Sequence, residues 1–142
     1  MEQNTSFKVK LVKWIPALII FGTSWYLSSQ ETIEQMPEFW NADKFVHFIC
    51  FGGLSFWVSF ACNIRVKKMF WLPSAIVSVY GIIDEIHQSF TPGRDSSVFD
   101  WCADTLGGVM GAFVFLLVLH LIGRFWARGC NGAERSAKQN ER

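Results

Sequence analysis

Charged residues gather in short blocks along this chain of 142 residues, and long uncharged intervals separate the blocks. The intervals that could cross a membrane cover residues 14–30, 45–64, 69–83 and 105–123. A helix rising about 1.5 Å per residue needs about 20 residues to cross the hydrocarbon core of a bilayer. The third interval reaches this length only if it continues through Asp84 and Glu85 to Phe90. The sequence therefore predicts an all-α fold, a bundle of four transmembrane helices.

Basic residues are unevenly divided between the two sides of such a bundle. Segments 1–13, 65–68 and 124–142 carry 11 basic and three acidic residues, whereas the remaining connections and helix ends carry two basic and nine acidic ones. Because Lys and Arg accumulate on the cytoplasmic side, we expect both termini to be cytoplasmic and the protein to be a multi-pass protein of the cytoplasmic (inner) membrane. A net charge of +1 excludes a nucleic-acid binder that depends on net charge.

Three regions follow from this division. Residues 1–13 form a basic cytoplasmic segment, residues 14–123 the membrane domain, and residues 124–142 a basic cytoplasmic tail that is almost free of apolar residues beyond Ala127 and is expected to be disordered. A competing interpretation makes residues 1–29 a signal peptide and leaves three spans. Its weakness is the ending Leu27-Ser28-Ser29, which is a poor small-residue cleavage site.

Polar residues recur at one end of three expected helices. Pairs spaced four apart, which share a helix face, are Asp43 with His47, Asp84 with Gln88, and Asp100 with Asp104. Ionisable residues inside a membrane are costly, and they therefore face the bundle interior or a wet cavity where they find partners. The sequence predicts that these pairs share one cavity near the outer surface, beneath the turn formed by residues 91–97.

Each residue of this cluster also has a structural interpretation. Asp43, Lys44 and Asp100 lie at expected helix starts, where an acid caps free N–H groups and complements the helix dipole. His47 could be a bundle histidine with its hydrogen bonds satisfied. Asp84 and Glu85 are harder to explain this way, because they lie far from a helix start and need Arg94, a cation or a proton to compensate their charge.

The chemistry open to such a cavity is limited. Carboxylates with one or two imidazoles suit a divalent cation, either Mg²⁺, Mn²⁺ or Ca²⁺ with mostly oxygen ligands or Zn²⁺ if His47 and His87 both join. The candidate catalytic residues, which are also the candidate metal ligands, are Asp84, Glu85 and His47. The candidate substrate-binding residues are Arg94, Gln88, Asp43, Lys44, Asp100 and Asp104. Whether a cofactor is needed stays open.

Three stretches together resemble the VanZ-like family over about residues 11–123. They are Asp43-Lys44-x-x-His47-Phe48, Asp84-Glu85-x-x-Gln88-x-Phe90-x-Pro92-Gly93-Arg94, and Asp100-x-x-x-Asp104-Thr105-x-Gly107. The resemblance implies a small multispan envelope protein, and the member that gave the family its name is associated with low-level resistance to the glycopeptide teicoplanin. It implies no mechanism. The family commonly has Asn where this chain has Asp104, which adds a potential negative charge to the cavity.

Two functional classes follow from these residues. In the first, the protein acts at the outer leaflet on a lipid-linked or cell-wall anion: Asp84 and Glu85 hold a cation or exchange a proton, Arg94 binds the anion, and His47 is an acid or base. In the second, it is a non-catalytic binding or scaffold protein whose polar cluster is structural. The sequence leaves open whether the protein is an enzyme and whether it oligomerises.

Overall fold

Four helices make up the part of the chain described by the computed structural model, which covers residues 10–32, 39–65 and 69–140, with side chains described as far as residue 128. They are α2 (Ile15–Ser28), α3 (Ala42–Ala61), α4 (Trp71–Gln88) and α5 (Val98–Asn140). No strand occurs in the described ranges, which confirms the all-α prediction. Most of the basic N-terminal segment expected at residues 1–13 lies outside the described residues.

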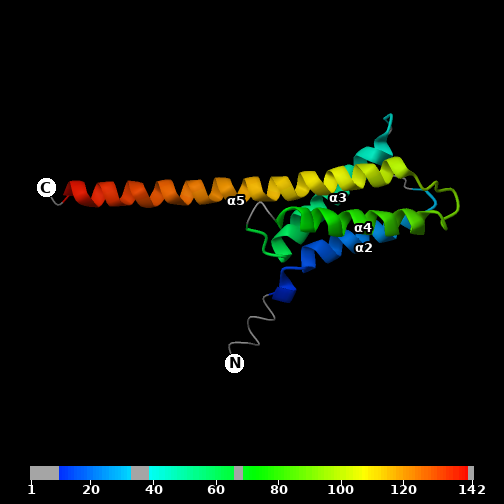
Figure 1. Cartoon of the computed structure of the whole chain (residues 1–142), viewed down its shortest axis with the longest axis horizontal. Helices are drawn as coiled ribbons and strands as arrows, with labels where there is room; N and C mark the ends of the chain where they lie inside the picture. Colours follow the sequence, from blue (N-terminus) through cyan, green and yellow to red (C-terminus); the bar gives the residue numbers. More distant parts are fainter. Residues whose placement is uncertain (1–9, 33–38, 66–68, 141–142) are drawn as a thin grey trace, which may run out of the picture.

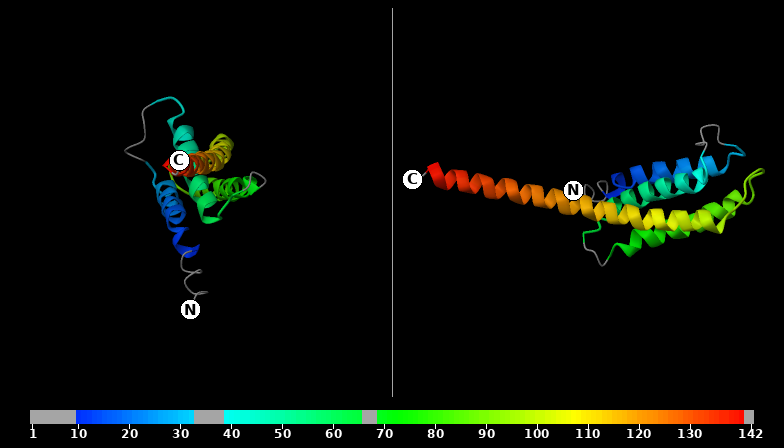
Figure 2. Two further views of the ribbon diagram at one scale, coloured as in Figure 1. Left: turned by 90° about the vertical axis from the view of Figure 1, so that its left-hand side faces the viewer. Right: turned by 90° about the horizontal axis from the view of Figure 1, so that it is seen from above.

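The four helices lie side by side as a bundle, with the ends of α2 and α4 and the starts of α3 and α5 at one end (Figures 1 and 2). At the opposite end are the start of α2, the end of α3, the start of α4, and the point where α5 leaves the bundle. The side chain of Lys13 lies over the ring of Phe60, 5.5 Å from its centroid, which ties the start of α2 to the end of α3.

Local sequence accounts for several helix boundaries. Pro16 lies in the first turn of α2, where its missing N–H has no intrahelical partner to lose. Asn41 adopts a left-handed conformation (φ 60°) immediately before α3, and Gly93 (φ 79°) allows the tight turn between α4 and α5. α4 continues through Asp84 and Glu85, as the longer version of the predicted third interval requires.

Three segments are long and apolar enough to cross a membrane: Lys10–Ser28, Ala42–Ala61 and Val98–Arg128. α4 is not among them, because the polar residues in its last turns lower its hydropathy. It nevertheless packs within the bundle, against α5 and α3. The fold is therefore a membrane-type helical bundle with three spans defined by length and composition among the described residues.

Glycines allow α3 and α5 to approach closely. A Cβ atom added at Gly107 would meet the carbonyl of Phe48, and one at Gly111 would meet the carbonyl of Gly52. Small residues at spacing four permit such backbone contact between membrane helices. A small apolar core fills the space between α2, α3 and α4 at Ala17, Phe51, Leu54, Val58, Val77 and Tyr80.

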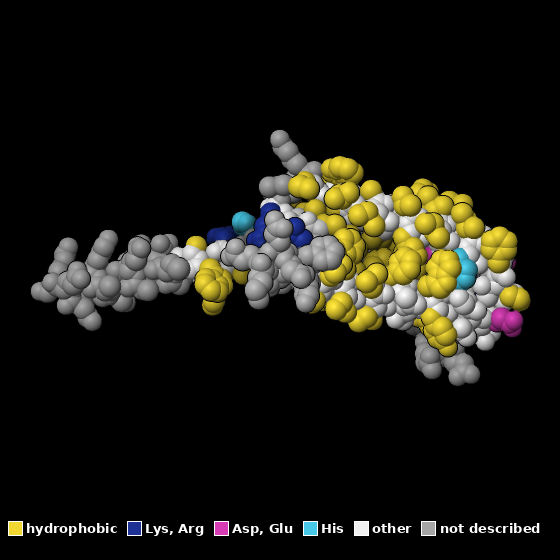
Figure 3. Space-filling model, turned by 90° about the horizontal axis from the view of Figure 1, so that it is seen from below, with side chains coloured by type: hydrophobic (Ala, Val, Ile, Leu, Met, Phe, Trp, Pro, Cys, Tyr) yellow, Lys and Arg dark blue, Asp and Glu magenta, His cyan; other side chains and the backbone are white. Residues whose placement is uncertain are grey.

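Large apolar side chains remain exposed over much of the bundle, as Figure 3 shows for one face. In a membrane these side chains would face lipid instead of water. Lys and Arg side chains gather near the end of the bundle from which α5 emerges, and acidic side chains appear at the other end (Figure 3).

The C-terminal tail differs from the prediction. Residues 124–140, expected to be disordered, continue α5 as helix. Disorder was predicted because the tail cannot bury an apolar face, but its Ala, Arg, Glu, Lys and Gln residues are strong helix formers, and no proline interrupts them. A helix that is already nucleated in the bundle extends into such a sequence at little cost.

Candidate functional site

The predicted polar pairs come together at one end of the bundle, where α2 and α4 end and α3 and α5 begin. The buried polar side chains at this end are Ser24, Ser28, His47, Asp84, Glu85, Gln88, Asp100 and Asp104. They belong to all four helices. We call this set, with Asp43, Lys44 and Arg94, the polar cluster.

One half of the polar cluster joins α3 to α5. His47 Nδ1 lies 2.9 Å from Asp104 Oδ1, and both side chains are buried. The other ring nitrogen of His47 is 3.9 Å from the partly exposed Asp43. The ammonium of Lys44 lies 3.0 Å from Asp100 Oδ1, an ion pair by distance, although the contact lacks hydrogen-bond geometry. Asp100 thus pairs with a neighbouring helix, in addition to lying in the first turn of its own.

The other half joins α2 to α4. Ser28 Oγ lies 2.8 and 2.9 Å from the two carboxylate oxygens of Asp84, which is fully buried. Gln88 Nε2 donates to Asp84 Oδ2 (3.1 Å). Arg94 in turn donates to Gln88 Oε1 (3.4 Å), so the loop after α4 is connected to the same network.

Asp84 and Glu85 point in different directions although they are adjacent. Successive residues of a helix are about 100° apart around its axis, so adjacent side chains face different neighbours. Asp84 faces α2 through Ser28, whereas Glu85 offers an oxygen within 4.8 Å of ligand atoms on His47 and Asp104. Glu85 Oε2 also accepts a hydrogen bond from the backbone N–H of Ser97 (2.7 Å).

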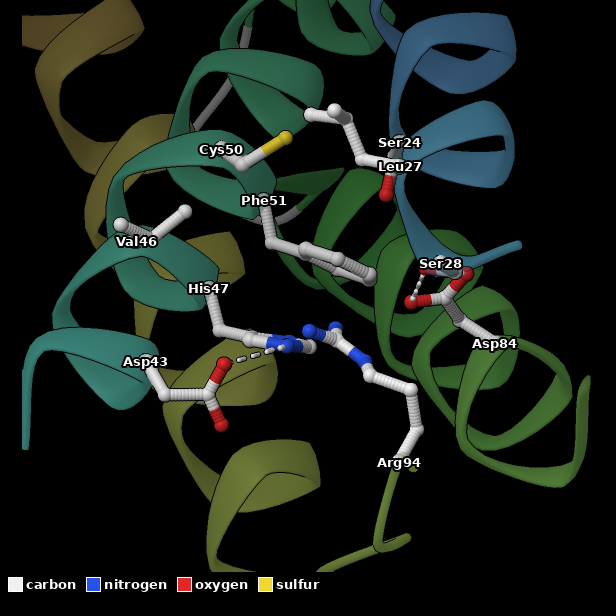
Figure 4. Close-up of a pocket in the computed structure, with 10 residues that line it drawn as sticks. All are labelled: Ser24, Leu27, Ser28, Asp43, Val46, His47, Cys50, Phe51, Asp84 and Arg94. Carbon is white, nitrogen blue, oxygen red and sulfur yellow. Dashed lines mark hydrogen bonds and ion pairs between the residues drawn. The ribbon is translucent and has the colours of Figure 1, made fainter. Parts of the chain in front are cut away.

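A small cavity of about 40 Å³ lies between the two halves. Its polar lining consists of Ser24, Ser28, Asp43, His47, Asp84 and Arg94, and its apolar lining of Leu27, Val46, Cys50 and Phe51. Figure 4 shows the side chain of Arg94 reaching from the loop toward His47, with Asp84 and Ser28 on the far side. A volume of this size admits water or a small polar group, not a whole lipid headgroup.

The structure therefore brings all nine candidate residues to the same end of the bundle. They do not form one group, because different residues contact different helices. The candidate metal ligands are separated: Glu85 and His47 lie together with Asp104, and Asp84 lies with Ser28. His87 does not join them. Its ring stacks on Trp25 with centroids 3.9 Å apart, and its Nε2 lies 3.5 Å from Ser29 Oγ.

Sequence reasoning missed Ser28, the Ser97 backbone and Gly81. A Cβ at Gly81 would lie 2.8 Å from Asp104 Oδ2, so this glycine leaves the space that Asp104 occupies. Ser24 and Ser28 had a usable signal, because they are four apart and form a polar stripe on an otherwise apolar span. The Ser97 N–H and the absent side chain of Gly81 leave no comparable pattern.

The fold and the polar cluster together define a class: an α-helical membrane protein with buried acidic residues and a histidine at one end of its bundle. A family profile described as VanZ/LLP1 matches residues 1–120. The chain belongs to the VanZ/LLP1 family, which confirms the resemblance seen in its motifs. No curated protein and no solved structure gives a significant match.

Proposed function

We propose that the protein is a four-span protein of the cytoplasmic membrane that binds a lipid-linked or cell-wall anion at the polar cluster and contributes to glycopeptide (teicoplanin) tolerance. Its membrane domain covers residues 14–123, α4 crosses the membrane in addition to the three segments that qualify by length and composition, and both termini are cytoplasmic. The polar cluster then lies toward the outer surface.

The distribution of charge supports this orientation. Among the residues that the structure describes, five basic ones lie at or beyond the end of the bundle opposite to the polar cluster: Lys10, Lys13, Arg65, Arg124 and Arg128. Positive residues favour the cytoplasmic side. α4 packs against α5 and α3, and its polar residues Asp84, Glu85 and Gln88 are buried, so they are shielded from lipid, as charged residues in spans require.

The convergence of Arg94, His47 and Asp84 on one cavity carries the proposal. The guanidinium of Arg94 is a donor suited to phosphate and carboxylate oxygens, and its contact with Gln88 is long enough to be exchanged for an anion. The cavity itself is too small for a headgroup. An anion would therefore contact Arg94 at the outer edge of the cavity. Gln88, Asp43, Lys44, Asp100 and Asp104 then hold or orient the groups that touch it.

Two versions of this function differ in whether the bound anion reacts. In the enzymatic version, His47, oriented by its contact with Asp104, transfers a proton, and the carboxylates of Asp84 and Glu85 compensate charge. In the binding version, the anion is held without reaction. Both versions require the cluster to act on a ligand.

A scaffold role is the second candidate, and a specific observation favours it. Asp84 is already paired with Ser28 and Gln88, and Lys44 with Asp100, so that the two halves of the cluster join α2 to α4 and α3 to α5 without a ligand. Breaking a buried network by removing one partner typically destabilises a protein by several kcal/mol. A scaffold therefore predicts a loss of protein, not of activity.

Measuring teicoplanin tolerance together with membrane abundance separates these roles. We expect Asp84→Asn, His47→Ala and Arg94→Lys to lower tolerance while abundance stays near that of the wild type. Asp95→Asn is the matched control, because it changes an exposed acid beside Arg94. Unchanged tolerance in all three variants would refute the proposal, and tolerance that falls only in proportion to abundance would favour the scaffold.

A further inference from the structure

We propose that His47, Glu85 and Asp104 form a binding site for a divalent first-row transition-metal ion such as Zn²⁺ or Mn²⁺. These residues come from α3, α4 and α5, and each offers a ligand atom within 4.8 Å of the other two. Ligand atoms of a tetrahedral Zn²⁺ ion lie about 2 Å from the metal and therefore about 3.3 Å from one another. Closure of these separations by at most about 1.5 Å would bring the three side chains into coordination.

Two carboxylate oxygens of this trio have no hydrogen-bond partner within the described part of the chain, namely Glu85 Oε1 and Asp104 Oδ2. Glu85 is 8% exposed and Asp104 is fully buried. A buried acceptor without a partner costs about 1–3 kcal/mol, and more when it is charged. This independent observation indicates that the trio has unused capacity to bind a cation.

The nearby cations are engaged elsewhere. Lys44 pairs with Asp100, and Arg94 donates to Gln88. A protonated His47 carries one positive charge, which balances the charge of Asp104 alone. Glu85 is therefore left without a cationic partner. A divalent ion between the two carboxylates would balance both charges and allow His47 to bind as a neutral imidazole.

The ligand types favour a transition metal over Mg²⁺ or Ca²⁺. An imidazole suits Zn²⁺ and its neighbours in the series, and carboxylates suit Mn²⁺ as well, whereas Mg²⁺ and Ca²⁺ prefer sites built only from oxygen. Three protein ligands also leave a position open for water or substrate, as catalytic zinc sites do. The trio differs from the ligand set expected from the sequence, because Asp104 takes the place of Asp84.

The role of the ion beside a bound anion rests on the proposed function. Metal binding itself does not, because it needs no substrate. The test therefore uses the full chain in detergent, stripped with a chelator and dialysed against Zn²⁺, Mn²⁺ or Mg²⁺ in turn. We expect elemental analysis to find about one retained Zn²⁺ or Mn²⁺ ion per chain and no retained Mg²⁺. Glu85→Gln and Asp104→Asn should each weaken retention roughly tenfold or more.

Asp95→Asn is the control, since it removes a carboxylate outside the trio and leaves the Lys44–Asp100 pair intact, and it should retain the ion. Absence of retained Zn²⁺ and Mn²⁺ in the wild type would overturn the inference. Retention by Glu85→Gln and by Asp104→Asn equal to that of the wild type would overturn it as well. A measurement on the wild type alone covers the case in which these variants do not fold. The absorption spectrum of Co²⁺ bound to the wild type should indicate nitrogen and oxygen ligands, and thiolate bands in it would refute the site.

The two proposals can fail separately. Arg94→Lys leaves the trio intact, so it should retain the metal while losing tolerance. A protein that binds no metal but loses tolerance in Arg94→Lys would overturn the metal site and leave anion binding standing. Metal retention without any effect of Arg94→Lys on tolerance would overturn anion binding by Arg94 and leave the metal site standing.

Discussion

Gly81 determines at the scale of a single residue how α4 accommodates Asp104. A Cβ at position 81 would lie 2.8 Å from Asp104 Oδ2 and 3.3 Å from Trp101 Cδ1. We therefore expect Gly81→Ala to displace both side chains and to lower stability by about 1–3 kcal/mol, the usual cost of overpacking. Thermal unfolding of the detergent-solubilised protein measures this.

Gly123→Ala is the control for this change, because a Cβ there meets nothing within 4 Å. In a helix interior that replacement should be neutral or slightly stabilising, since alanine has the higher helix propensity. Equal unfolding temperatures for Gly81→Ala and Gly123→Ala would show that Asp104 is not held against α4.

Ser28 supplies a second prediction for a single residue. Its hydroxyl lies against both oxygens of the buried Asp84, so Ser28→Ala leaves that carboxylate with Gln88 as its remaining partner. We expect a loss of about 1–3 kcal/mol in stability, as for other buried groups deprived of a partner. Ser29→Ala should have a much smaller effect in the same unfolding assay, because the exposed Ser29 hydroxyl donates to the Trp25 carbonyl and its 3.5 Å contact with His87 is long.

Among the elements, the extent of α4 shows what a linear pattern can predict. Uncharged intervals located all four helices, and spacing of four identified the polar pairs, because both follow from helix geometry within one segment. The pattern could not decide whether α4 ends before Asp84. That depends on Ser28 and Ser97, whose contacts compensate the carboxylates from elsewhere in the chain.

The division between Asp84 and Glu85 was equally hidden from the sequence. Adjacent positions must face different directions, but which neighbour each one meets depends on how α4 is rotated in the bundle. That rotation is set by side-chain packing among α2, α3 and α5, including the space at Gly81. Apart from Ser24 and Ser28, the residues of the polar cluster were therefore predicted from the sequence, and their partners were not.

Close packing of α3 on α5 gives a prediction for a pair of elements. A side chain at Gly111 would collide with the carbonyl of Gly52, which is backbone and cannot rotate away. We expect Gly111→Leu to force the helices apart, reducing both membrane abundance and unfolding temperature. Gly123→Leu, later on the same helix and open on its Cβ side, should change neither. If Gly111→Leu behaves like Gly123→Leu, the glycine contact does not hold α3 and α5 together.

For the whole molecule, the number of spans depends on α4, which is not among the segments that qualify as spans by length and composition and which contributes Asp84, Glu85 and Gln88 to the polar cluster. A span can afford these residues only if neighbouring helices shield them from lipid. Four spans place the turn after α4 on the outer side and the connection before it in the cytosol. If α4 does not cross, both connections must lie on the same side, and α5 must then run in the opposite direction.

Paired reporter fusions resolve this arrangement. Alkaline phosphatase, which is active only outside the cytoplasm, should be active when fused after Asp95 and inactive after Arg65 or after Asn140. A fluorescent protein that matures only in the cytoplasm should give the reciprocal result at each position, which controls for differences in expression. The physical reason is the positive residues near positions 65–68 and 124–142, which resist transfer across the membrane. The same reporter being active after both Arg65 and Asp95 would mean that α4 does not cross. Phosphatase activity after both Arg65 and Asn140, with none after Asp95, would invert the bundle and place the polar cluster in the cytosol, out of reach of any ligand outside the membrane.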